Sequence, residues 1–398
     1  MIYDAIIIGG GIVGMATAYK YQRKYSEHQI LVLEKESDFA MHQTGRNSGV
    51  IHSGVYYKPG SRKARTCTDG RLQLEAFAKE HNVAYDNCGK VIVATQPEEV
   101  PQLDVIMQRG KENGLDGLTW LNADEIKAIE PECSGIKGIR VPQTGIIDYV
   151  GFVKALRDQI LKIQPQSEIL VDSEVVSISN SEGGKEIKTQ NNQYTGKTLI
   201  SCGGLQADRL AKLDGLQPEV RIVPFRGDYY DLTESGIPKV KHLIYPVPNP
   251  EFPFLGVHFT RMIHGGVECG PNAVFSFARE GYTKTSFNLK DSIQSLGFSG
   301  TWKLFAKHWK HGMGEYHRAF SKAAFLKALQ RLIPSLTDED IIPARAGIRA
   351  QALDSKGKLV DDFSFAKGKN SLHVMNAPSP AATACLAIAD EILEELNK

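Results

Sequence analysis

The sequence predicts an α/β fold, and three features of its first forty residues support that prediction. Residues 2–8 (IYDAIII) form a short isoleucine-rich run, as expected of a strand that is buried on both faces. The glycine-rich turn GGGIVG follows at once, and residues 12–25 then show helical periodicity. A second apolar run, ILVL at 30–33, ends at Glu34. This order of strand, glycine turn, helix, strand and acid is typical of a dinucleotide-binding βαβ unit.

The glycines of this turn have separate physical roles. Gly9 permits a tight turn, Gly11 lets a pyrophosphate approach the backbone, and Gly14 lets the helix pack closely on the strand. The helix N-terminus presents free N–H groups and the positive end of its dipole to the phosphates. Glu34 lies where a carboxylate can accept hydrogen bonds from ribose hydroxyls. The spacing therefore predicts that this unit binds a dinucleotide.

The segment 42–57, HQTGRNSGVIHSGVYY, indicates which dinucleotide is bound. It resembles the second flavin motif of the D-amino-acid-oxidase-like superfamily. More narrowly, it is similar to the L-2-hydroxyglutarate dehydrogenase/oxidase family. Five further segments resemble that family: PFRGDYY, GVHFTR, GPNAV, PARAGIRAQ and NAPSPAAT. The resemblance covers essentially the full length, is weakest at about 280–335, and implies noncovalently bound FAD.

The resemblance also implies a glycine-oxidase-like architecture of two domains. We expect an α/β, Rossmann-like FAD-binding domain that is discontinuous in sequence, and an α+β substrate domain with a mixed antiparallel sheet. Alternating apolar residues and turn glycines between 219 and about 272 support that sheet. The expected FAD-binding domain comprises residues 1–85, 146–220 and 340–398, and the expected substrate domain comprises residues 86–145 and 221–339.

The residues expected at the cofactor come from five parts of the chain. In the resembled family, small hydroxyl and glycine residues of the second motif lie along the pyrophosphate and the flavin, and backbone groups near Val175 contact adenine. Pro380 and the small residues around it are expected to open the last helix, whose N-terminus can stabilise negative charge on a reduced flavin. The expected cofactor-binding residues are Gly9, Gly11, Gly14, Glu34, Lys35, Thr44, Gly45, Ser48, Gly49, Val175, Gly203, Ser379, Pro380, Ala381, Ala382 and Thr383.

The activity that the resemblance implies is oxidation of L-2-hydroxyglutarate to 2-oxoglutarate, with hydride transfer to flavin N5. Electrons would then pass to a quinone or to oxygen. Motif spacing alone indicates only an FAD-dependent oxidoreductase of a small carboxylate. Two alternatives stay open: an amino-acid oxidase of the glycine or sarcosine type on the same scaffold, and a non-catalytic flavoprotein.

Oxidation of an alcohol needs a group that accepts the hydroxyl proton, and histidine suits this role near neutral pH. His52 lies in the second flavin motif, and His258 lies in the strand-like segment GVHFT. We favour His52 as the base and keep His258 as the alternative.

The substrate carboxylate needs a fixed cation, and a guanidinium fork suits that task. Arg349 is our choice because its GIR context resembles the GLR segment in which glycine-oxidase-like enzymes grip the carboxylate; Arg345 could substitute. A dicarboxylate needs a second cation, for which Arg226 is a candidate, although a fold-stabilising ion pair explains it equally well. Tyr245 and Tyr57 are candidate pocket residues, although packing alone can explain a tyrosine in a strand.

Composition excludes several other classes. The 47 basic residues nearly balance 46 acidic ones, so the chain as a whole does not indicate a nucleic-acid partner. No apolar run is long enough to span a bilayer, and no secretory signal precedes the first strand, which predicts a cytoplasmic protein. No CxxC pair is present, and we expect no metal site.

The segment 284–332 differs from the rest of the chain in its charge. Nine Lys or Arg residues lie between Lys284 and Arg331, opposed only by Asp291 and Glu315. Aromatic and small residues recur there at helical spacing, and lysines follow the same spacing beside them: Trp302, Phe305, Ala306 and Trp309, with Lys303, Lys307 and Lys310. Later apolar residues continue the pattern: Phe320, Ala324, Phe325, Leu329 and Leu332. We expect peripheral contact with the cytoplasmic membrane face, against the alternative of a helix packed on the substrate domain.

Overall fold

The structure, a computed structural model, describes residues 1–248 and 256–398. Its first sheet has eight strands in the order β10-β11-β12-β1-β2-β9, with β20 beside β12 and β19 beside β20. Strands β9, β2, β1, β12 and β20 run parallel to their neighbours in this group, as the βαβ pattern predicts, whereas β11 pairs antiparallel with β12. The bounds are β1 Ile2–Ile8, β2 Ile30–Leu33, β9 Glu168–Leu170, β10 Val175–Ser181, β11 Gly184–Thr189, β12 Gln193–Ser201, β19 Ser364–Gly368 and β20 Ser371–Asn376.

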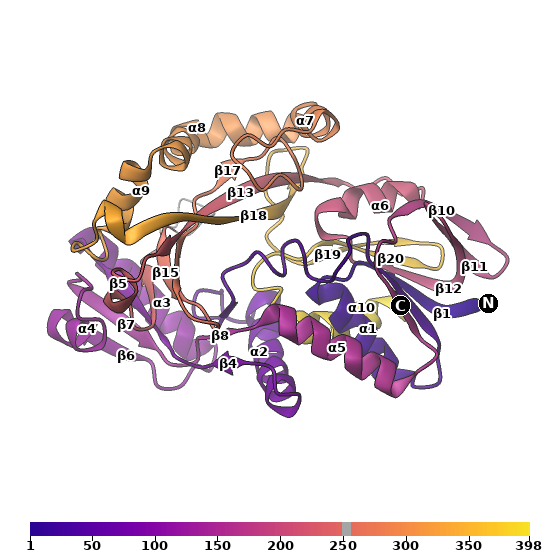
Figure 1. Ribbon diagram of the computed structural model, residues 1–398, viewed down its shortest axis with the longest axis horizontal. Helices are drawn as coiled ribbons and strands as arrows, with labels where there is room; N and C mark the ends of the chain where they lie inside the picture. The colour runs from indigo at the N-terminus through magenta and orange to yellow at the C-terminus, as the bar shows by residue number, and fades with distance from the viewer. Residues whose placement is uncertain (249–255) are drawn as a thin grey trace.

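Helices cover both faces of this sheet (Figure 1). Alternate residues of β1 point to opposite sides: Ala5 and Ile7 join a core with four helices, whereas Ile6 and Ile8 join a smaller core on the other face with Leu210 of α6. This two-sided burial explains why the strand has a continuous apolar sequence. The helices on the larger core are α1 Ile12–Lys24, α2 Arg62–Glu80, α5 Tyr149–Ile163 and α10 Cys385–Leu396, and α6 spans Ala207–Leu213.

The second sheet has nine strands in the order β17-β13-β16-β15-β14-β5-β7-β6, with β18 beside β13. Its pairs are antiparallel except that β14 runs parallel to β5, so the predicted mixed antiparallel sheet is confirmed. The bounds are β5 Lys90–Ala94, β6 Thr119–Asn122, β7 Lys137–Val141, β13 Val220–Leu232, β14 Leu243–Pro246, β15 His258–Arg261, β16 Val267–Gly270, β17 Val274–Phe275 and β18 Ile341–Asp354.

A small three-stranded sheet and two helices complete this half. The order is β3-β8-β4, with β3 at Val50–Ile51, β4 at Tyr85–Asp86 and β8 at Gly145–Ile147. Helix α3 spans Val100–Glu112 and α4 spans Ala123–Ile129. Helix α4 begins at Asn122, whose side chain accepts hydrogen bonds from the backbone N–H groups of Asp124 and Glu125.

Strand β18 differs from the domain assignment that we expected. We placed residues 340–398 wholly with the FAD-binding part, but β18 pairs with β13 along its length, from Val220 opposite Asp354 to Leu232 opposite Ile341. The reason is that two long strands satisfy each other's backbone groups across the second sheet, a pairing of distant segments that local sequence does not reveal. The boundary on this side therefore falls after Asp354.

The basic segment forms three helices at the periphery of the second sheet: α7 Leu289–Leu296, α8 Ser299–Phe320 and α9 Lys322–Leu329 (Figure 1). The backbone of α8 is kinked at His308. Among the described residues, no helix has the length and apolar character needed to cross a membrane.

The amphipathic pattern of this segment is only partly as predicted. Trp302 and Trp309 are more than half exposed on α8. Phe305, in contrast, packs edge-on against Phe275, and the later residues of the expected apolar face belong to the core: Phe325, Leu329 and Leu332 are buried. Helix α9 therefore packs on the second sheet, whereas α7 and α8 keep large apolar side chains in solvent.

Candidate active site

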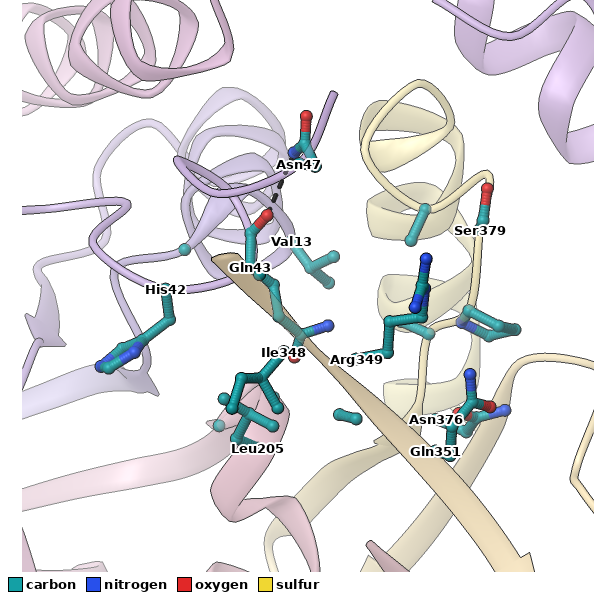
Figure 2. Close-up of a pocket in the computed structure, with 18 of the residues that line it drawn as sticks. Val13, His42, Gln43, Asn47, Leu205, Ile348, Arg349, Gln351, Asn376 and Ser379 are labelled. Atoms are coloured by element: carbon teal, nitrogen blue, oxygen red, sulfur yellow. Dashed lines mark hydrogen bonds between the residues drawn. The ribbon is translucent and has the colours of Figure 1, made fainter. Parts of the chain in front are cut away.

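A cavity of about 2520 Å³ lies where the two sheets face each other. It is lined by the glycine turn and second motif on one side, by β13, β14, β15 and β18 on another, and by the segment before α10. Figure 2 shows Arg349 of β18 extending into this space toward Ser379, with Val13 and Gln43 nearby. Twelve of the sixteen expected cofactor residues line the cavity: Gly9, Gly11, Glu34, Lys35, Thr44, Ser48, Val175, Gly203, Ser379, Pro380, Ala381 and Ala382.

The glycine turn and the second motif are joined where a pyrophosphate would lie. The backbone N–H of Ile12, at the start of α1, donates to Thr44 Oγ1 at 3.0 Å. A Cβ added at Gly11 would meet only Thr44 Oγ1, at 3.4 Å, so this backbone faces open space. A phosphate can therefore approach the first turn of α1, where the helix dipole favours negative charge. These observations fit the dinucleotide that the spacing predicts.

Glu34 is held in place at the end of β2. Its Oε2 accepts a hydrogen bond from Gly10 N at 2.7 Å, and its Oε1 accepts one from Glu36 N at 2.9 Å. A carboxylate oxygen has a second lone pair, so both oxygens can still accept from ribose hydroxyls. The buried carboxylate lines the cavity, as the predicted role requires.

Lys35 lies in a charged cluster that the sequence did not predict. Its Nζ is 3.0 Å from Glu280 Oε2 and is also paired with Glu36. His42 Nε2 lies 2.8 Å from Glu36 Oε1. Because the lysine already neutralises these carboxylates, we interpret the cluster as an ion-pair network that joins the second motif to the segment after β17.

Four expected cofactor residues do not line the cavity. Gly14 has the packing role proposed for it, because a Cβ there would lie 2.0 Å from Gly9 O. A Cβ at Gly45 would lie 2.4 Å from Ala40 O, and Gly49 has a φ of 67°. Thr383 positions a neighbour: its Oγ1 accepts a hydrogen bond from the His52 backbone N–H at 3.0 Å. These four residues shape the backbone around the cavity.

The segment before the last helix also differs from expectation. Helix α10 begins at Cys385, whereas residues 379–384 form turns, so Pro380 does not open the regular helix. Ala384 N nevertheless donates to Pro380 O at 2.9 Å. Thr383, which bonds Val50 O and Tyr149 Oη, holds these turns against the second motif. The turns, rather than a helix terminus, face the cavity.

Both candidate histidines line the cavity and are neutral near pH 7. Burial lowers the pKa of His258 to about 4, and the charges of Arg349 and Lys90 lower it further; a hydrogen bond to Gly256 O opposes this shift. That bond, at 2.9 Å, requires Nδ1 to carry the proton, because a carbonyl oxygen can only accept. The Nε2 of His258 is therefore left as a proton acceptor.

His52 lies beside this group. Burial lowers its pKa to about 3, with smaller contributions from the charges of Lys90 and His258. Its Nε2 lies 3.4 Å from Ser379 Oγ, a hydroxyl that can donate or accept. Within residues 1–248 and 256–398, no hydrogen bond thus fixes the tautomer of His52, whereas the bond to Gly256 O fixes that of His258.

The structure separates the two arginines of β18. Arg349 lines the cavity, and its guanidinium donates to Asn272 O at 3.1 Å. Arg345 instead joins the two halves of the protein: it pairs with Glu268 Oε1 at 3.0 Å and donates to Gly45 O and Asn47 O. Of the two, Arg349 is the one that lines the cavity.

Arg226 does not line the cavity, in contrast to its expected role as a second substrate cation. Its Nε is 2.8 Å from Asp228 Oδ1, and its guanidinium also donates to Thr283 O at 2.6 Å. Both charged side chains are buried, so the fold-stabilising ion pair explains this arginine. Tyr57 and Tyr245 do line the cavity, and Tyr245 stacks on His258 with ring centroids 4.2 Å apart.

Sequence reasoning missed Lys90, at the start of β5. Only 2% of this lysine is exposed, and its Nζ lies 4.3 Å from the ring centroid of Tyr56 and 5.0 Å from that of Tyr245. Burial lowers its pKa to about 7. A signal was present, because Lys90 directly precedes the apolar run VIVA of a buried strand, where a lysine is rare.

Comparison with known proteins agrees with this site. Residues 4–395 match the family described as FAD dependent oxidoreductase. The chain is 46% identical over 397 residues to L-2-hydroxyglutarate dehydrogenase of Indibacter alkaliphilus, covering 99% of this chain and 98% of the relative. It is 41% identical over 419 residues to the mitochondrial L-2-hydroxyglutarate dehydrogenase of Homo sapiens, covering 100% of this chain and 89% of the relative.

Solved structures show the same fold. Dithionite-reduced L-alpha-glycerophosphate oxidase from Mycoplasma pneumoniae, with FAD bound, has a TM-score of 0.81 and 25% identity, covering 100% of this chain and 95% of that one. Glycine oxidase from Geobacillus kaustophilus has a TM-score of 0.74 and 15% identity, covering 99% of this chain and 94% of that one. The fold is thus the two-domain architecture that we expected, and the cavity suits the cofactor of the matching family. We conclude that this chain belongs to the family of FAD-dependent oxidoreductases.

Proposed function

We propose that the protein oxidises L-2-hydroxyglutarate to 2-oxoglutarate. The observation that carries this proposal is the group of Arg349, His258 and His52 at one end of a cavity whose other end suits a dinucleotide. Relatives that are 41% and 46% identical over nearly the whole chain bear the name L-2-hydroxyglutarate dehydrogenase, which supports the choice of substrate.

Each residue of this group has a chemical task. Arg349 binds the carboxylate next to the reacting carbon, so that the Cα–H is held in one orientation. His258 accepts the hydroxyl proton at Nε2, since its Nδ1 proton is committed to Gly256 O. Bound FAD supplies the two-electron acceptor that takes the hydride at N5. His52 is the neighbouring imidazole and remains the alternative base.

Anaerobic titration of the holoenzyme tests the substrate. We expect L-2-hydroxyglutarate to bleach the visible absorption band of the flavin and to yield 2-oxoglutarate, whereas D-2-hydroxyglutarate, glycine and sarcosine leave the band unchanged. Bleaching by glycine or sarcosine alone would support the amino-acid oxidase instead. No bleaching by any of these compounds would contradict the proposed function.

We also propose that electrons leave to a membrane quinone, with oxygen as the alternative acceptor, and that α7 and α8 contact the cytoplasmic face of an anionic bilayer. Seven apolar side chains on and beside these helices are more than half exposed: Phe287, Leu289, Ile293, Trp302, Trp309, Met313 and Phe320. Such side chains can enter the lipid interface. A lipid-soluble acceptor would give this contact a purpose.

The charge of the same helices supports an anionic surface. The two acids of the segment already have partners, because Asp291 pairs with Arg209 and Glu315 pairs with Arg318. Lys307 and Lys310 are exposed beside the tryptophans. These two lysines can therefore contact lipid headgroups, whereas Arg318, Lys322 and Arg331 are held in ion pairs within the protein.

Sedimentation with liposomes tests the membrane contact. We expect binding to vesicles that contain anionic lipid, and we expect this binding to weaken as salt rises or when Trp302 and Trp309 are both replaced by Ser. The matched control replaces the exposed Trp120, which lies on β6 at a distance from this segment, and should bind like the wild type. Equal binding to neutral and anionic vesicles, or binding to neither, would contradict the proposal.

A further inference from the structure

Lys90 places a positive charge in the interior, and none of the acidic residues that the structure describes pairs with it. Among the described residues, its Nζ takes part in no ion pair or hydrogen bond. Its cation–π contacts are with the rings of Tyr56 and Tyr245. An isolated buried ammonium is strongly unfavourable, so its retention needs an explanation.

A second polar group at the same place also lacks a partner. The Tyr56 hydroxyl is buried and, within the described parts of the chain, forms no hydrogen bond, although Tyr56 lines the cavity. Tyr245, the other ring beside Lys90, also lines the cavity. An ammonium and a hydroxyl that both lack partners would be satisfied together by one anionic oxygen group.

Lys90 is not itself a lining residue of the cavity, but its Nζ lies directly behind two rings that line it, Tyr56 and Tyr245, and Tyr245 stacks on His258. The charges of Lys90 and Arg349 act on His258, and the charge of Lys90 also acts on His52. The two histidines therefore lie within electrostatic range of Lys90, and His258 lies within range of both cations. Arg226, the cation that we expected to bind a second carboxylate, instead forms a buried ion pair with Asp228.

We propose that Lys90, with the hydroxyl of Tyr56, binds the distal carboxylate of a dicarboxylate substrate, while Arg349 binds the carboxylate at the reacting carbon. This inference rests on the proposed function and deepens it, because it names the residue that distinguishes a dicarboxylate from a monocarboxylate. A positive group that is desolvated and held between two rings discriminates strongly, since a substrate without the second carboxylate leaves it unpaired.

A substrate series separates this role from a general effect on the histidines. We compare L-2-hydroxyglutarate with L-2-hydroxyvalerate, which has the same carbon chain and lacks the distal carboxylate. For Lys90→Met we expect kcat/KM for L-2-hydroxyglutarate to fall about 100-fold, while kcat/KM for L-2-hydroxyvalerate changes less than about threefold. The control is Lys137→Met on the neighbouring strand β7, whose Nζ lies 4.0 Å from the ring centroid of Trp120. Equal losses for both substrates, or no loss for either, would overturn the proposal.

The pH profile supplies an independent readout. The groups that face Lys90 are Tyr56, Tyr245, His52, His258 and Cys67, and none has a pKa between about 5 and 10. Since the pKa of Lys90 is lowered to about 7, kcat/KM for L-2-hydroxyglutarate should fall as pH rises through about 7. Lys90→Arg stays charged, so the fall should disappear in that variant. Identical alkaline profiles in the wild type and Lys90→Arg would contradict the role of Lys90.

Binding of glutarate distinguishes a failure of this inference from a failure of the proposed function. Glutarate has both carboxylates and no hydroxyl, and its affinity for the holoenzyme is measured by titration calorimetry. If the wild type binds glutarate but does not oxidise L-2-hydroxyglutarate, the proposed function fails; a loss of glutarate binding in Lys90→Met then still supports the dicarboxylate site. If Lys90→Met binds glutarate as tightly as the wild type does, the inference about Lys90 is wrong whatever the oxidation result.

Discussion

At the scale of single residues, the neighbours of each side chain decide its protonation, its tautomer and whether it lines the cavity. Gly256 O fixes the tautomer of His258, and burial keeps both histidines neutral. Arg349 and Arg345 are four residues apart on one strand, yet only Arg349 lines the cavity. Residue type alone therefore predicts the candidates, and the contacts decide among them.

The first prediction at this scale concerns Arg349. Replacement by Lys exchanges a bidentate fork for a point charge, so kcat/KM for L-2-hydroxyglutarate should fall by an amount equivalent to roughly 2–4 kcal/mol of transition-state stabilisation. Steady-state kinetics measure this change. Arg140→Lys, at an exposed position of β7, is the control and should behave like the wild type. An unchanged kcat/KM in Arg349→Lys would show that this residue does not bind the carboxylate.

The second prediction concerns the base and its pH dependence. His258→Gln should retain FAD and slow flavin reduction roughly 100-fold or more, whereas His52→Gln should have a smaller effect; the reverse order would assign the base to His52. Because the pKa of His258 is lowered to about 4, the base is already free at pH 6, and the rate should decline only as pH falls toward about 4. Stopped-flow reduction across pH measures both effects.

The lowered pKa of His258 also makes the free energy of unfolding depend on pH. The folded pKa of His258 lies below the usual value of 6.5, so the unfolded chain binds a proton more readily than the folded protein does between those two values. This contribution to stability is complete above pH about 6.5 and is lost as pH falls through about 4.

At the scale of elements, the turn between β1 and α1 shows how two nearby glycines differ. A Cβ at Gly14 would collide with Gly9 O at 2.0 Å, whereas a Cβ at Gly11 meets only Thr44 Oγ1 at 3.4 Å. Gly14 is therefore required by the packing of α1 on β1, and Gly11 is required by what enters the cavity.

The prediction that follows compares these two glycines. Gly11→Val should fold and lose FAD, because its side chain enters the space that the pyrophosphate needs. Gly14→Val should fail to fold or lose much of its stability, since the added atoms meet backbone. The flavin-to-protein absorbance ratio and the melting temperature of each variant measure this difference. A fully yellow Gly11→Val protein would contradict the assignment of the phosphate loop.

At the scale of the whole molecule, polar and apolar contacts both join the second sheet to the cofactor-binding half. Arg345 is the main example, since it reaches from β18 to Glu268 of β16 and to the carbonyl groups of Gly45 and Asn47 in the second motif. Glu268 is buried, and burial raises its pKa, whereas Arg345 lowers it. The pKa of Glu268 thus lies above its usual value although the charge of Arg345 opposes the effect of burial, and the same arginine holds Gly45 and Asn47 against the second sheet.

The corresponding prediction is a loss of stability in Arg345→Met. The free energy of unfolding should fall by about 1–2 kcal/mol at pH 7, a modest value because the arginine is 40% exposed and solvent screens the pair. Glu268→Gln in the same chain should restore most of the loss, since it removes the unpaired charge. Chemical denaturation of the four proteins of this cycle measures the coupling. Additive losses would show that the two side chains are not coupled.

Some features of this protein were predictable from sequence because their causes are local. The strands at 2–8 and 30–33 have the predicted bounds, since burial on both faces imposes a continuous apolar run. The turn glycines and Glu34 were predictable because a phosphate site needs a fixed spacing along one βαβ unit. Arg349 and both histidines, which were chosen from short motifs, line the cavity, and their roles stay predictions.

Other features were decided only by tertiary structure, because they depend on segments that are distant in the chain. The partner of β18 is a strand more than a hundred residues away. Arg226 does not reach the cavity because its guanidinium bonds Asp228 and Thr283 O. The burial of Phe325 and Leu329 depends on the sheet beneath α9, although their spacing matches that of an exposed amphipathic face equally well. Lys90 is the clearest example: the sequence shows a lysine beside an apolar strand, and only the packing of Tyr56 and Tyr245 around it reveals a buried charge that no described residue pairs with.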